Sequence, residues 1–469
     1  MSWDSIYIMR HEVLLALLIL FQLIADFSEK REKNRIVLTT IVGFFLFTVV
    51  GFFPSADTIL FGGMYVSDEL RLLLKNILSV CTLIVFLQAS TWLNDPLHQE
   101  KAGAFYLSIL STLMGMFFMI SAGDFLMLYL GLELATLPLT LLAAFDKGLR
   151  RSAEAGVKLL MSSAVSSAVL LFGLSMMYGV YGTFRFAEIS LLTDDSYLSI
   201  LALVFFLSGL GFKISLVPFH LWTADVYEGA PLAVTTYFSV VSKGAALFTL
   251  MLVLYFVFGH QTQIWTTALY VLAVITMIVG NLFALRQKNL KRFLAFSSIT
   301  QVGFLMLGFM NSEALGMSTI VYFMLIYALS NLAVFGVLSI VFNATGKESM
   351  DDLNGFYATN PGLSLIMLVS LFSLAGIPPV AGFFGKFFLF AAAASDGQYI
   401  LVLIAVLNAT LSLYYYLLVV KAMFINKNDS PLATLRATAY EKIALGLCLA
   451  GVLIIGFTSS VYEYIHSVM

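Results

Sequence analysis

Long apolar runs separated by short polar breaks follow one another from near residue 12 to near residue 463. A helix that crosses the ~30 Å hydrocarbon core of a membrane needs roughly 20 mostly apolar residues. The pattern therefore predicts about fourteen spanning helices. They lie near residues 12–27, 35–53, 70–92, 103–121, 123–145, 152–181, 197–225, 231–258, 265–285, 292–310, 314–343, 362–393, 398–424 and 440–463. We expect an all-α polytopic membrane protein, with residues 1–469 in a single membrane domain.

Lysine and arginine are distributed unevenly over the loops. Loops after odd-numbered helices, with their helix margins, hold seventeen of these residues: Lys30, Arg31, Lys33, Arg35, Lys101, Lys147, Arg150, Arg151, Arg286, Lys288, Lys291, Arg292, Lys347, Lys421, Lys427, Arg436 and Lys442. The opposite side holds only Arg10, Arg71 and Arg185. Because these residues accumulate on the cytoplasmic side of membranes, we expect the odd-numbered loops in the cytoplasm and both chain ends outside. The helix count is then even.

Composition supports a membrane protein and excludes several other classes. Hydrophobic residues make up 60% of the chain and charged residues 11%, whereas soluble domains usually carry about 25% charged residues. With a net charge of −2 and no long basic run, nucleic acid is not an expected partner. Glycine-rich phosphate loops, nucleotide fingerprints and metal-spaced His/Cys clusters are absent from the sequence. We expect no cofactor bound by this chain.

Five lysines lie inside the predicted helices: Lys75, Lys158, Lys213, Lys243 and Lys386. Lys75 is near a helix end, and we expect its ammonium to extend to the membrane interface. Lys243 lies about 18 Å into its helix and Lys158 about 10 Å beyond the basic helix end, at 1.5 Å per residue. A charge at the bilayer centre costs at least ~2.5–3.5 kcal/mol, so the four deeper lysines require partners or a function.

The most deeply placed acid is Glu133, about 13.5 Å past the start of its helix. Burial favours a neutral lysine and a nearby carboxylate favours the charged form, so moving the partner switches the proton. Glu133 beside a lysine, with further lysines along a hydrated path, would form a proton relay. Glu154 and Lys158 are four residues apart and either pair within this relay or form an ordinary surface pair. The alternative for the whole set is static ion pairs that lock helices together.

Two predicted helices combine Gly, Pro and a lysine near their middle. The seventh reads FFLSGLGFKISLVPFHLWTADV, with Lys213 before Pro218, and the twelfth reads LVSLFSLAGIPPVAGFFGKFFLF, with Lys386 after Pro379. Proline breaks the helical ladder, which a membrane tolerates only where protein or cavity water replaces the lost partners. Corresponding breaks indicate an internal repeat with ion sites at the breaks. His220, seven residues after Lys213, suits a proton relay or a structural role equally.

The predicted organisation follows from these breaks. Residues 1–95 hold the first three helices, 100–260 the first repeat, 262–425 the second repeat and 438–469 the last helix. Ser297, Ser298 and Gln301 in the tenth helix could hold water between the halves, but packing between helices is their expected role.

The segment VPFHLWTADVYEGAP resembles the PFHxWxPDVYxGAP segment of the antiporter-like membrane subunits of respiratory complex I, NADH-quinone oxidoreductase. KRFLAFSSITQVGFLMLG and GIPPVAGFFGKF extend the resemblance over about residues 100–425. It implies two inverted five-helix repeats with broken seventh and twelfth helices. It also implies a non-redox, proton-translocating subunit driven by quinone reduction elsewhere in a complex that uses NADH and quinone. The lysine of GFFGKF favours the subunit N branch.

By the same resemblance, Glu133 is the acid of the fifth helix, Lys213 its partner, Lys243 the connecting lysine and Lys386 the exit-side lysine. The expected partners are other membrane subunits of complex I and the lipid bilayer, in a bacterial inner (cell) membrane. Ala224 replaces the usual proline of the PDVY segment. Gln301 stands where some relatives carry a histidine, which argues against a protonic role for the tenth helix.

Two alternatives remain from the sequence. A subunit of a multisubunit cation/proton antiporter would use the same path to exchange sodium for protons, and a membrane scaffold would hold static ion pairs. The absence of an obvious carboxylate-rich sodium site favours the complex I subunit over the antiporter.

Overall fold

The computed structural model describes residues 3–27, 34–428 and 430–469. Lys30, Arg31 and Lys33, which contribute to the predicted charge asymmetry, lie outside the described residues, and the side chain of Arg35 is not described either. The described chain forms two compact units, residues 1–214, 229–231 and 241–265 in unit 1 and residues 215–228, 232–240 and 266–469 in unit 2.

Every predicted apolar run coincides with a helix or with a pair of consecutive helices. Among the described residues, eleven helices are long and apolar enough to cross a membrane. The runs near 35–53 and 362–393 are outside that set because their described helices are shorter, and the run near 12–27 because its helix carries three charged residues, Arg10, Glu12 and Asp26. The all-α polytopic class is confirmed, and the count of fourteen stays a prediction.

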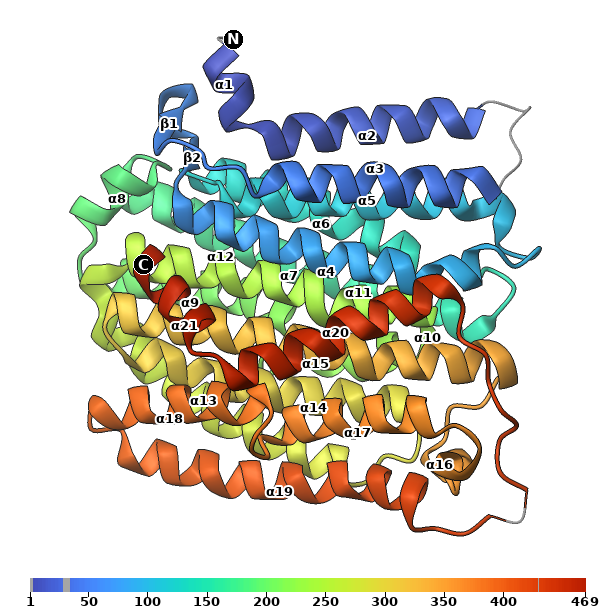
Figure 1. Ribbon diagram of the computed structural model, residues 1–469. Helices are drawn as coiled ribbons and strands as arrows, with labels where there is room; N and C mark the ends of the chain where they lie inside the picture. The colour runs from blue at the N-terminus through green and yellow to red at the C-terminus, as the bar shows by residue number, and fades with distance from the viewer. Residues whose placement is uncertain (1–2, 28–33, 429) are drawn as a thin grey trace. The chain divides into compact units, whose positions relative to one another are not determined.

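Unit 1 contains the N-terminal helices and one β-hairpin (Figure 1). Its elements are α1 (Trp3–Ile8), α2 (Arg10–Phe27), α3 (Asn34–Gly51), β1 (Thr58–Leu60), β2 (Tyr65–Ser67), α4 (Glu69–Leu93), α5 (Ala102–Ile120), α6 (Phe125–Ala143), α7 (Arg150–Tyr181), α8 (Phe186–Leu192), α9 (Tyr197–Ile214) and α12 (Lys243–Phe256). The two strands pair antiparallel, with Ile59 opposite Val66.

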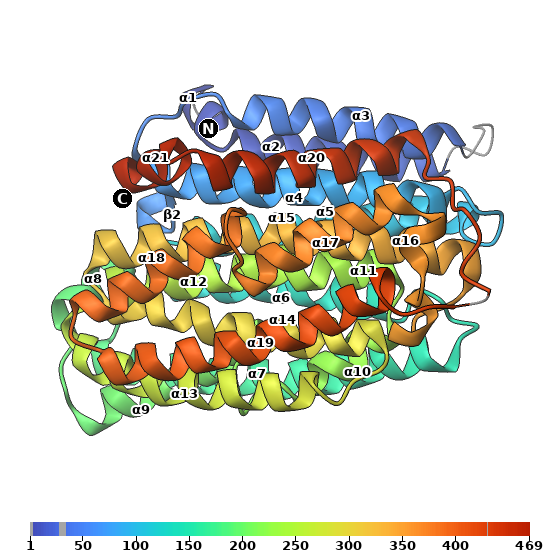
Figure 2. The same cartoon turned by 60° about the horizontal axis from the view of Figure 1, so that its bottom comes forward.

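Unit 2 contains the C-terminal helices (Figure 2). Its elements are α10 (Leu221–Gly229, except its last residue), α11 (Leu232–Tyr237), α13 (Thr262–Ala284, from Thr266), α14 (Leu290–Leu305), α15 (Glu313–Thr345), α16 (Phe356–Thr359), α17 (Pro361–Ala375), α18 (Ala381–Ser395), α19 (Tyr399–Phe424), α20 (Ala439–Phe457) and α21 (Ser460–Val468). The last predicted helix is wrong as a single element, because α20 ends at Phe457 and a separate short helix follows.

The loops of unit 1 gather in two sets. The hairpin reaches the loop after α5, where Val66 N donates to Ser121 O at 2.9 Å. The backbone of Asp124, in the same loop, pairs with the backbone of Arg185 after α7. The loops after α4 and α6 meet through His98 Nε2 and Asp146 Oδ1, which are 3.0 Å apart. Successive long helices of unit 1 therefore alternate in direction, as helices that span a membrane with short loops must.

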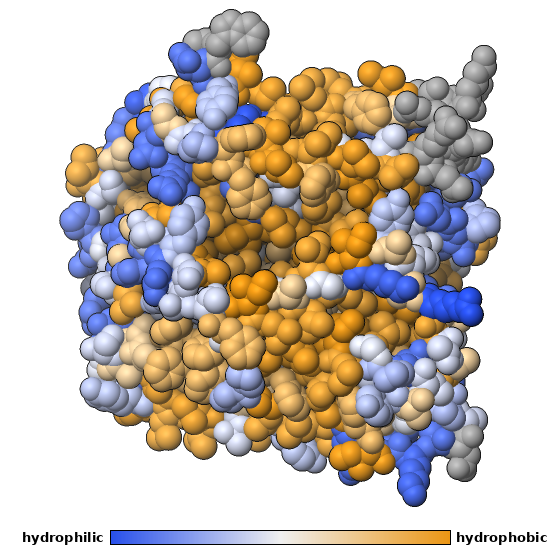
Figure 3. Space-filling model, in the orientation of Figure 1, coloured by the Kyte–Doolittle hydropathy of each residue, from blue (hydrophilic) through white to orange (hydrophobic). Residues whose placement is uncertain are grey.

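Apolar side chains cover the sides of the helices, and polar side chains gather near the helix ends on the face shown in Figure 3. On α7, Val157, Met161 and Val165 are 61%, 65% and 66% exposed and lie four residues apart on one face. Such a stripe is unfavourable against water and favourable against lipid.

Candidate functional site

The seventh predicted helix is interrupted, as its sequence indicates. α9 ends at Ile214 and α10 begins at Leu221. Between them, in unit 2, Val217 N donates to Thr276 Oγ1 at 3.1 Å. A side chain thus replaces a helical hydrogen-bond partner at the break, which is the condition under which irregular backbone is stable at membrane depth.

Lys213 lies on the last turn of α9 and contacts the helix that carries Glu133. Its ammonium donates to Thr136 Oγ1, three residues after Glu133 on α6. The Glu133 carboxylate attracts this ammonium electrostatically, and Glu133 Oε1 is buried without a hydrogen-bond partner. Unit 1 therefore brings Glu133 and Lys213 together as neighbours, while the lysine hydrogen-bonds to a neutral hydroxyl.

Close packing of α5 and α6 sets the position of Glu133. A Cβ on Gly131 would lie 2.7 Å from Gly115 O, and a Cβ on Gly115 would lie 2.4 Å from Ala135 N. Only glycine at both positions lets the two backbones approach this closely. The acid is therefore held on a helix whose position against α5 is sterically determined.

Asp124 forms the N-cap of α6 outside the spanning segment. Its Oδ1 accepts from Met127 N at 2.7 Å. Burial raises the pKa of its carboxyl, while the backbone hydrogen bonds and Arg185 oppose this rise. The cap satisfies an amide at the start of the helix that carries Glu133.

Lys243 is the first residue of α12 and is 2% exposed. A π-helical turn, Phe238–Ser242, immediately precedes it and separates α11 from α12. Such turns occur frequently at functional positions. The apolar pattern of the eighth helix gave no sign of this turn, because one extra residue in a fully buried helix does not alter its hydropathy.

Lys386 lies at the second break, in unit 2. α17 ends at Ala375, and Gly376 has φ +87°, which ends the helix before α18 begins. The Lys386 ammonium donates to Leu374 O and Ala375 O at 2.9 Å each and lies 4.7 Å from the Phe304 ring centroid. The terminal carbonyls of a helix carry partial negative charge, so the break itself forms the cation site.

Gln301 on α14 shares an acceptor with Lys386. Gln301 Nε2 donates to Leu374 O at 3.1 Å and to Tyr416 Oη at 3.1 Å, and Ser297 also bonds to Tyr416. Ser298 Oγ donates within its own helix, to Ala295 O. The contacts of Gln301 and Ser297 join helices of unit 2, as expected from packing, and those of Gln301 also place it beside the Lys386 site.

The predicted proton-transfer roles of Lys158 and His220 stay predictions. The expected burial of Lys158 is wrong within this chain: its side chain is 43% exposed and pairs with Glu154 at 2.7 Å. It points away from the core because α7 presents that face outward. His220 is half-buried and lies in the break, directly before α10.

The expected position of Lys75 is also wrong. Its ammonium does not extend to the interface: the residue is 3% exposed and lies 2.5 Å from Glu12 Oε1. Glu12, which is 3% exposed, was missed as a buried acid because it stands at the polar margin of the first apolar run. Only the pairing of distant segments shows that it is enclosed.

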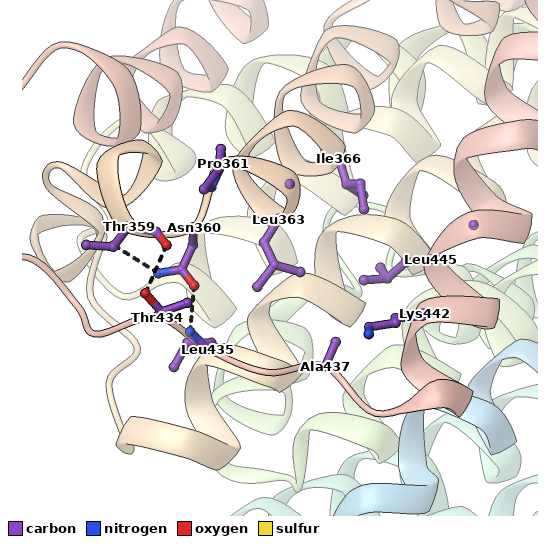
Figure 4. A pocket seen from close by; sticks show the side chains of 12 residues that line it. Thr359, Asn360, Pro361, Leu363, Ile366, Thr434, Leu435, Ala437, Lys442 and Leu445 are labelled. Atoms are coloured by element: carbon purple, nitrogen blue, oxygen red, sulfur yellow. Dashed lines mark hydrogen bonds between the residues drawn. The ribbon is translucent and has the colours of Figure 1, made fainter.

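A cavity of about 360 Å³ in unit 2 lies between the start of α17 and the start of α20 (Figure 4). Leu363, Ile366 and Leu445 form apolar parts of its lining, and Lys442 lies beside them. None of the lysines at the breaks lines it. Within the described residues, no group of three His, Cys, Asp or Glu side chains has the arrangement of a metal site.

Two interrupted helices in a helical membrane protein, with a lysine at each break, are the features of the class of antiporter-like membrane subunits. The family model described as NADH:quinone oxidoreductase/Mrp antiporter, TM, matches residues 122–412. The chain is 50% identical to NADH-quinone oxidoreductase subunit N of Azobacteroides pseudotrichonymphae, over 97% of this chain and 96% of that protein. It is 52% identical to subunit N of Phocaeicola vulgatus, over 87% and 86%. The chain belongs to the NADH-quinone oxidoreductase subunit N family.

Solved structures agree with this fold. A chain of respiratory complex I from Thermus thermophilus with bound aureothin is 26% identical, with a TM-score of 0.78 over 97% of this chain and 98% of that chain. A chain of the Mrp complex from Dietzia sp. DQ12-45-1b has a TM-score of 0.86 at 20% identity, over 100% and 97%. The second similarity concerns the fold alone.

Proposed function

We propose that this chain translocates protons as a non-redox membrane subunit of NADH:quinone oxidoreductase, driven by quinone reduction elsewhere in the complex. The observation that carries the proposal is the pair formed by Glu133 and Lys213 in unit 1. The ammonium is held by Thr136, one turn along α6 from a carboxylate oxygen that has no hydrogen-bond partner.

A lysine that is hydrogen-bonded to a hydroxyl beside a carboxylate can change partners at low energetic cost. When the ammonium approaches Glu133, the charged lysine is stabilised and holds a proton. When it withdraws to a neutral partner, desolvation favours release of the proton to the next acceptor. A tightly closed salt bridge would resist this movement, whereas a lysine bonded to a hydroxyl one turn away is positioned for both states.

Lys243 and Lys386 extend this scheme. Lys243, the buried first residue of α12, serves as the connecting lysine. Lys386, at the second break, serves as the exit-side lysine. The helix-terminal carbonyls at Lys386 stabilise a proton that arrives there, because they are strong acceptors aimed at the ammonium. His220, within the first break, is assigned to the supply of protons to Lys213, and Lys158 to transfer at the surface of α7.

The same proposal covers location and partners. The protein resides in a bacterial inner membrane with both termini outside, by the distribution of lysine and arginine. Its partners are other membrane subunits of complex I and the lipid bilayer, with no nucleic acid. NADH and quinone are used by the complex, and this chain binds no cofactor itself.

The test compares membranes that carry the wild-type chain, Lys213→Ala or Lys213→Arg. Quinone-reductase activity and proton pumping are measured on the same membranes, and assembly is checked on native gels. Lys147→Ala, which removes an exposed loop lysine, is the control for loss of a positive charge.

We expect both Lys213 variants to assemble and to lose proton pumping, because alanine carries no proton and arginine does not release one. Unchanged pumping in Lys213→Ala would refute the relay and favour a static scaffold. Pumping that is lost only when sodium is removed would instead favour cation/proton exchange, and the matching family description also names the Mrp antiporter.

A further inference from the structure

Glu12 on α2, Tyr65 on β2 and Lys75 on α4 form a closed ionisable cluster in unit 1. Lys75 Nζ lies 2.5 Å from Glu12 Oε1 and donates to Tyr65 Oη at 3.0 Å. The Tyr65 hydroxyl donates in turn to Glu12 Oε2 at 3.0 Å. The three residues are 3%, 0% and 3% exposed. Apolar residues of similar volume usually pack at least as stably as a buried ion pair, so packing alone does not account for these charges.

The cluster lies at the end of unit 1 where the hairpin and the loops after α5 and α7 gather. Arg71, one turn before Lys75, has its guanidinium 5.7 Å from the ring centroid of Phe256, the last residue of α12. This contact sets the register of the two helices, which run in opposite directions. At 1.5 Å per residue, Lys75 is about 6 Å below that level and Lys243 about 20 Å below it.

Buried hydroxyls occupy the interval between these two lysines. Thr249 on α12 lies about 10 Å below the same level, and Ser79 and Thr82 on α4 lie about 12 and 16 Å below it. All three are 0% exposed. Each hydroxyl donates to a carbonyl four residues earlier in its own helix, which leaves its oxygen able to accept a proton or a hydrogen bond.

We propose that Glu12, Tyr65 and Lys75 form a second proton-transfer site, which passes protons from Lys243 to the outward face of the membrane through the N-terminal helices. The inference rests on the proposed function and adds a branch to it. The titratable groups that interact with Lys75 are Glu12 and His11 on α2 and the Tyr65 hydroxyl on β2.

The transfer balances in three steps. The Lys75 ammonium gives a proton to the Glu12 carboxylate, which leaves a neutral amine and a neutral carboxyl. The Glu12 carboxyl then releases its proton on the outward side and becomes a carboxylate again. The Lys75 amine finally accepts a proton from the Lys243 ammonium, so one proton has moved outward and the Tyr65 hydroxyl has stayed neutral.

Two variants separate a proton site from a static clamp. Lys75→Arg keeps the positive charge and hence the ion pair, but the reference pKa of a guanidinium is well above that of an ammonium, which slows proton release by about 100-fold or more. The double variant Glu12→Gln with Lys75→Met removes both charges and leaves no unpaired ion. Each is inserted into the complete chain within the assembled complex, with Lys147→Ala as the control.

Protons pumped per quinone reduced are measured beside complex assembly on native gels. The proposal expects both variants to assemble, to retain quinone reduction and to pump fewer protons per quinone than wild type. Normal pumping in the double variant would overturn the proposal, since a clamp needs only balanced charges. Failure of both variants to assemble would likewise assign the cluster to folding.

Lys213→Ala, assayed in parallel, separates this inference from the proposed function. Loss of pumping in Lys213→Ala with normal pumping in the double variant would refute the N-terminal branch alone. Normal pumping in Lys213→Ala would refute the proposed function, on which the branch depends.

Discussion

Replacement of Lys386 by methionine tests whether the second break serves proton transfer or stability. The substitution removes two hydrogen bonds from a charged donor, each contributing roughly 1.5–3 kcal/mol. It also removes the ~2.5–3.5 kcal/mol cost of a charge at membrane depth. The gross loss of about 3–6 kcal/mol is thus largely offset, and we expect a net destabilisation of only about 0–3 kcal/mol. Gln301 still donates to Leu374 O, which limits the loss further.

The assay measures assembly and function on one preparation. Native gels and a thermal unfolding midpoint report stability of the complex that contains Lys386→Met, and quinone-driven proton uptake reports pumping. We expect a complex that assembles and reduces quinone but pumps fewer protons per quinone. Lys421→Met, which replaces an exposed lysine near the end of α19 in the same unit, is the matched control.

Two results would refute this reasoning. Loss of the assembled complex would mean that the hydrogen bonds at the break contribute more than the charge costs, which gives Lys386 a structural role. Unchanged pumping in an assembled complex would mean that no proton passes through Lys386.

Four further predictions follow from particular contacts. Gln301→Leu removes a donor from a buried network, so we expect a stability loss of about 1–3 kcal/mol with pumping per quinone retained, measured by thermal unfolding and proton uptake. Gly131→Ala places a Cβ against the backbone of α5, so we expect displaced Glu133 and less assembled complex on native gels than for a substitution at an open glycine. Arg292→Ala removes two partly exposed ion pairs, so we expect a loss of at most about 1 kcal/mol that shrinks at high salt in the same thermal assay. Lys158→Ala should reduce pumping less than Lys243→Ala, because its side chain is exposed; an equal loss would contradict this.

Much of the fold follows from local pattern because the membrane imposes local rules. Each spanning helix must satisfy its backbone within itself and must be about 20 apolar residues long, so the runs themselves mark the helices. The breaks before α10 and α18 were predictable for the same reason, since Pro218 and Pro379 remove helical donors where the chain must still satisfy its backbone. The π-helical turn before Lys243 left no such mark.

The candidate site was only partly predictable. Lys213 and Glu133 were found because ionisable residues deep in apolar helices are conspicuous in a sequence. The environment of Lys386 was not, because its ligands are backbone carbonyls of the preceding half-helix, and carbonyls are present at every residue. The role of Gln301 beside it depends on which face of α14 meets α17, and the sequence does not specify that contact.

Lys75 and Lys158 show most clearly where sequence and tertiary structure divide. Sequence determined that both lie in helices that cross the membrane, because hydropathy and length depend on neighbouring residues alone. Tertiary structure decided that Lys75 is enclosed by Glu12, 63 residues away, and that Lys158 faces outward beside Glu154. A helix that is apolar on all sides carries little information about its own rotation, so only packing against other helices determines which of its polar side chains are buried.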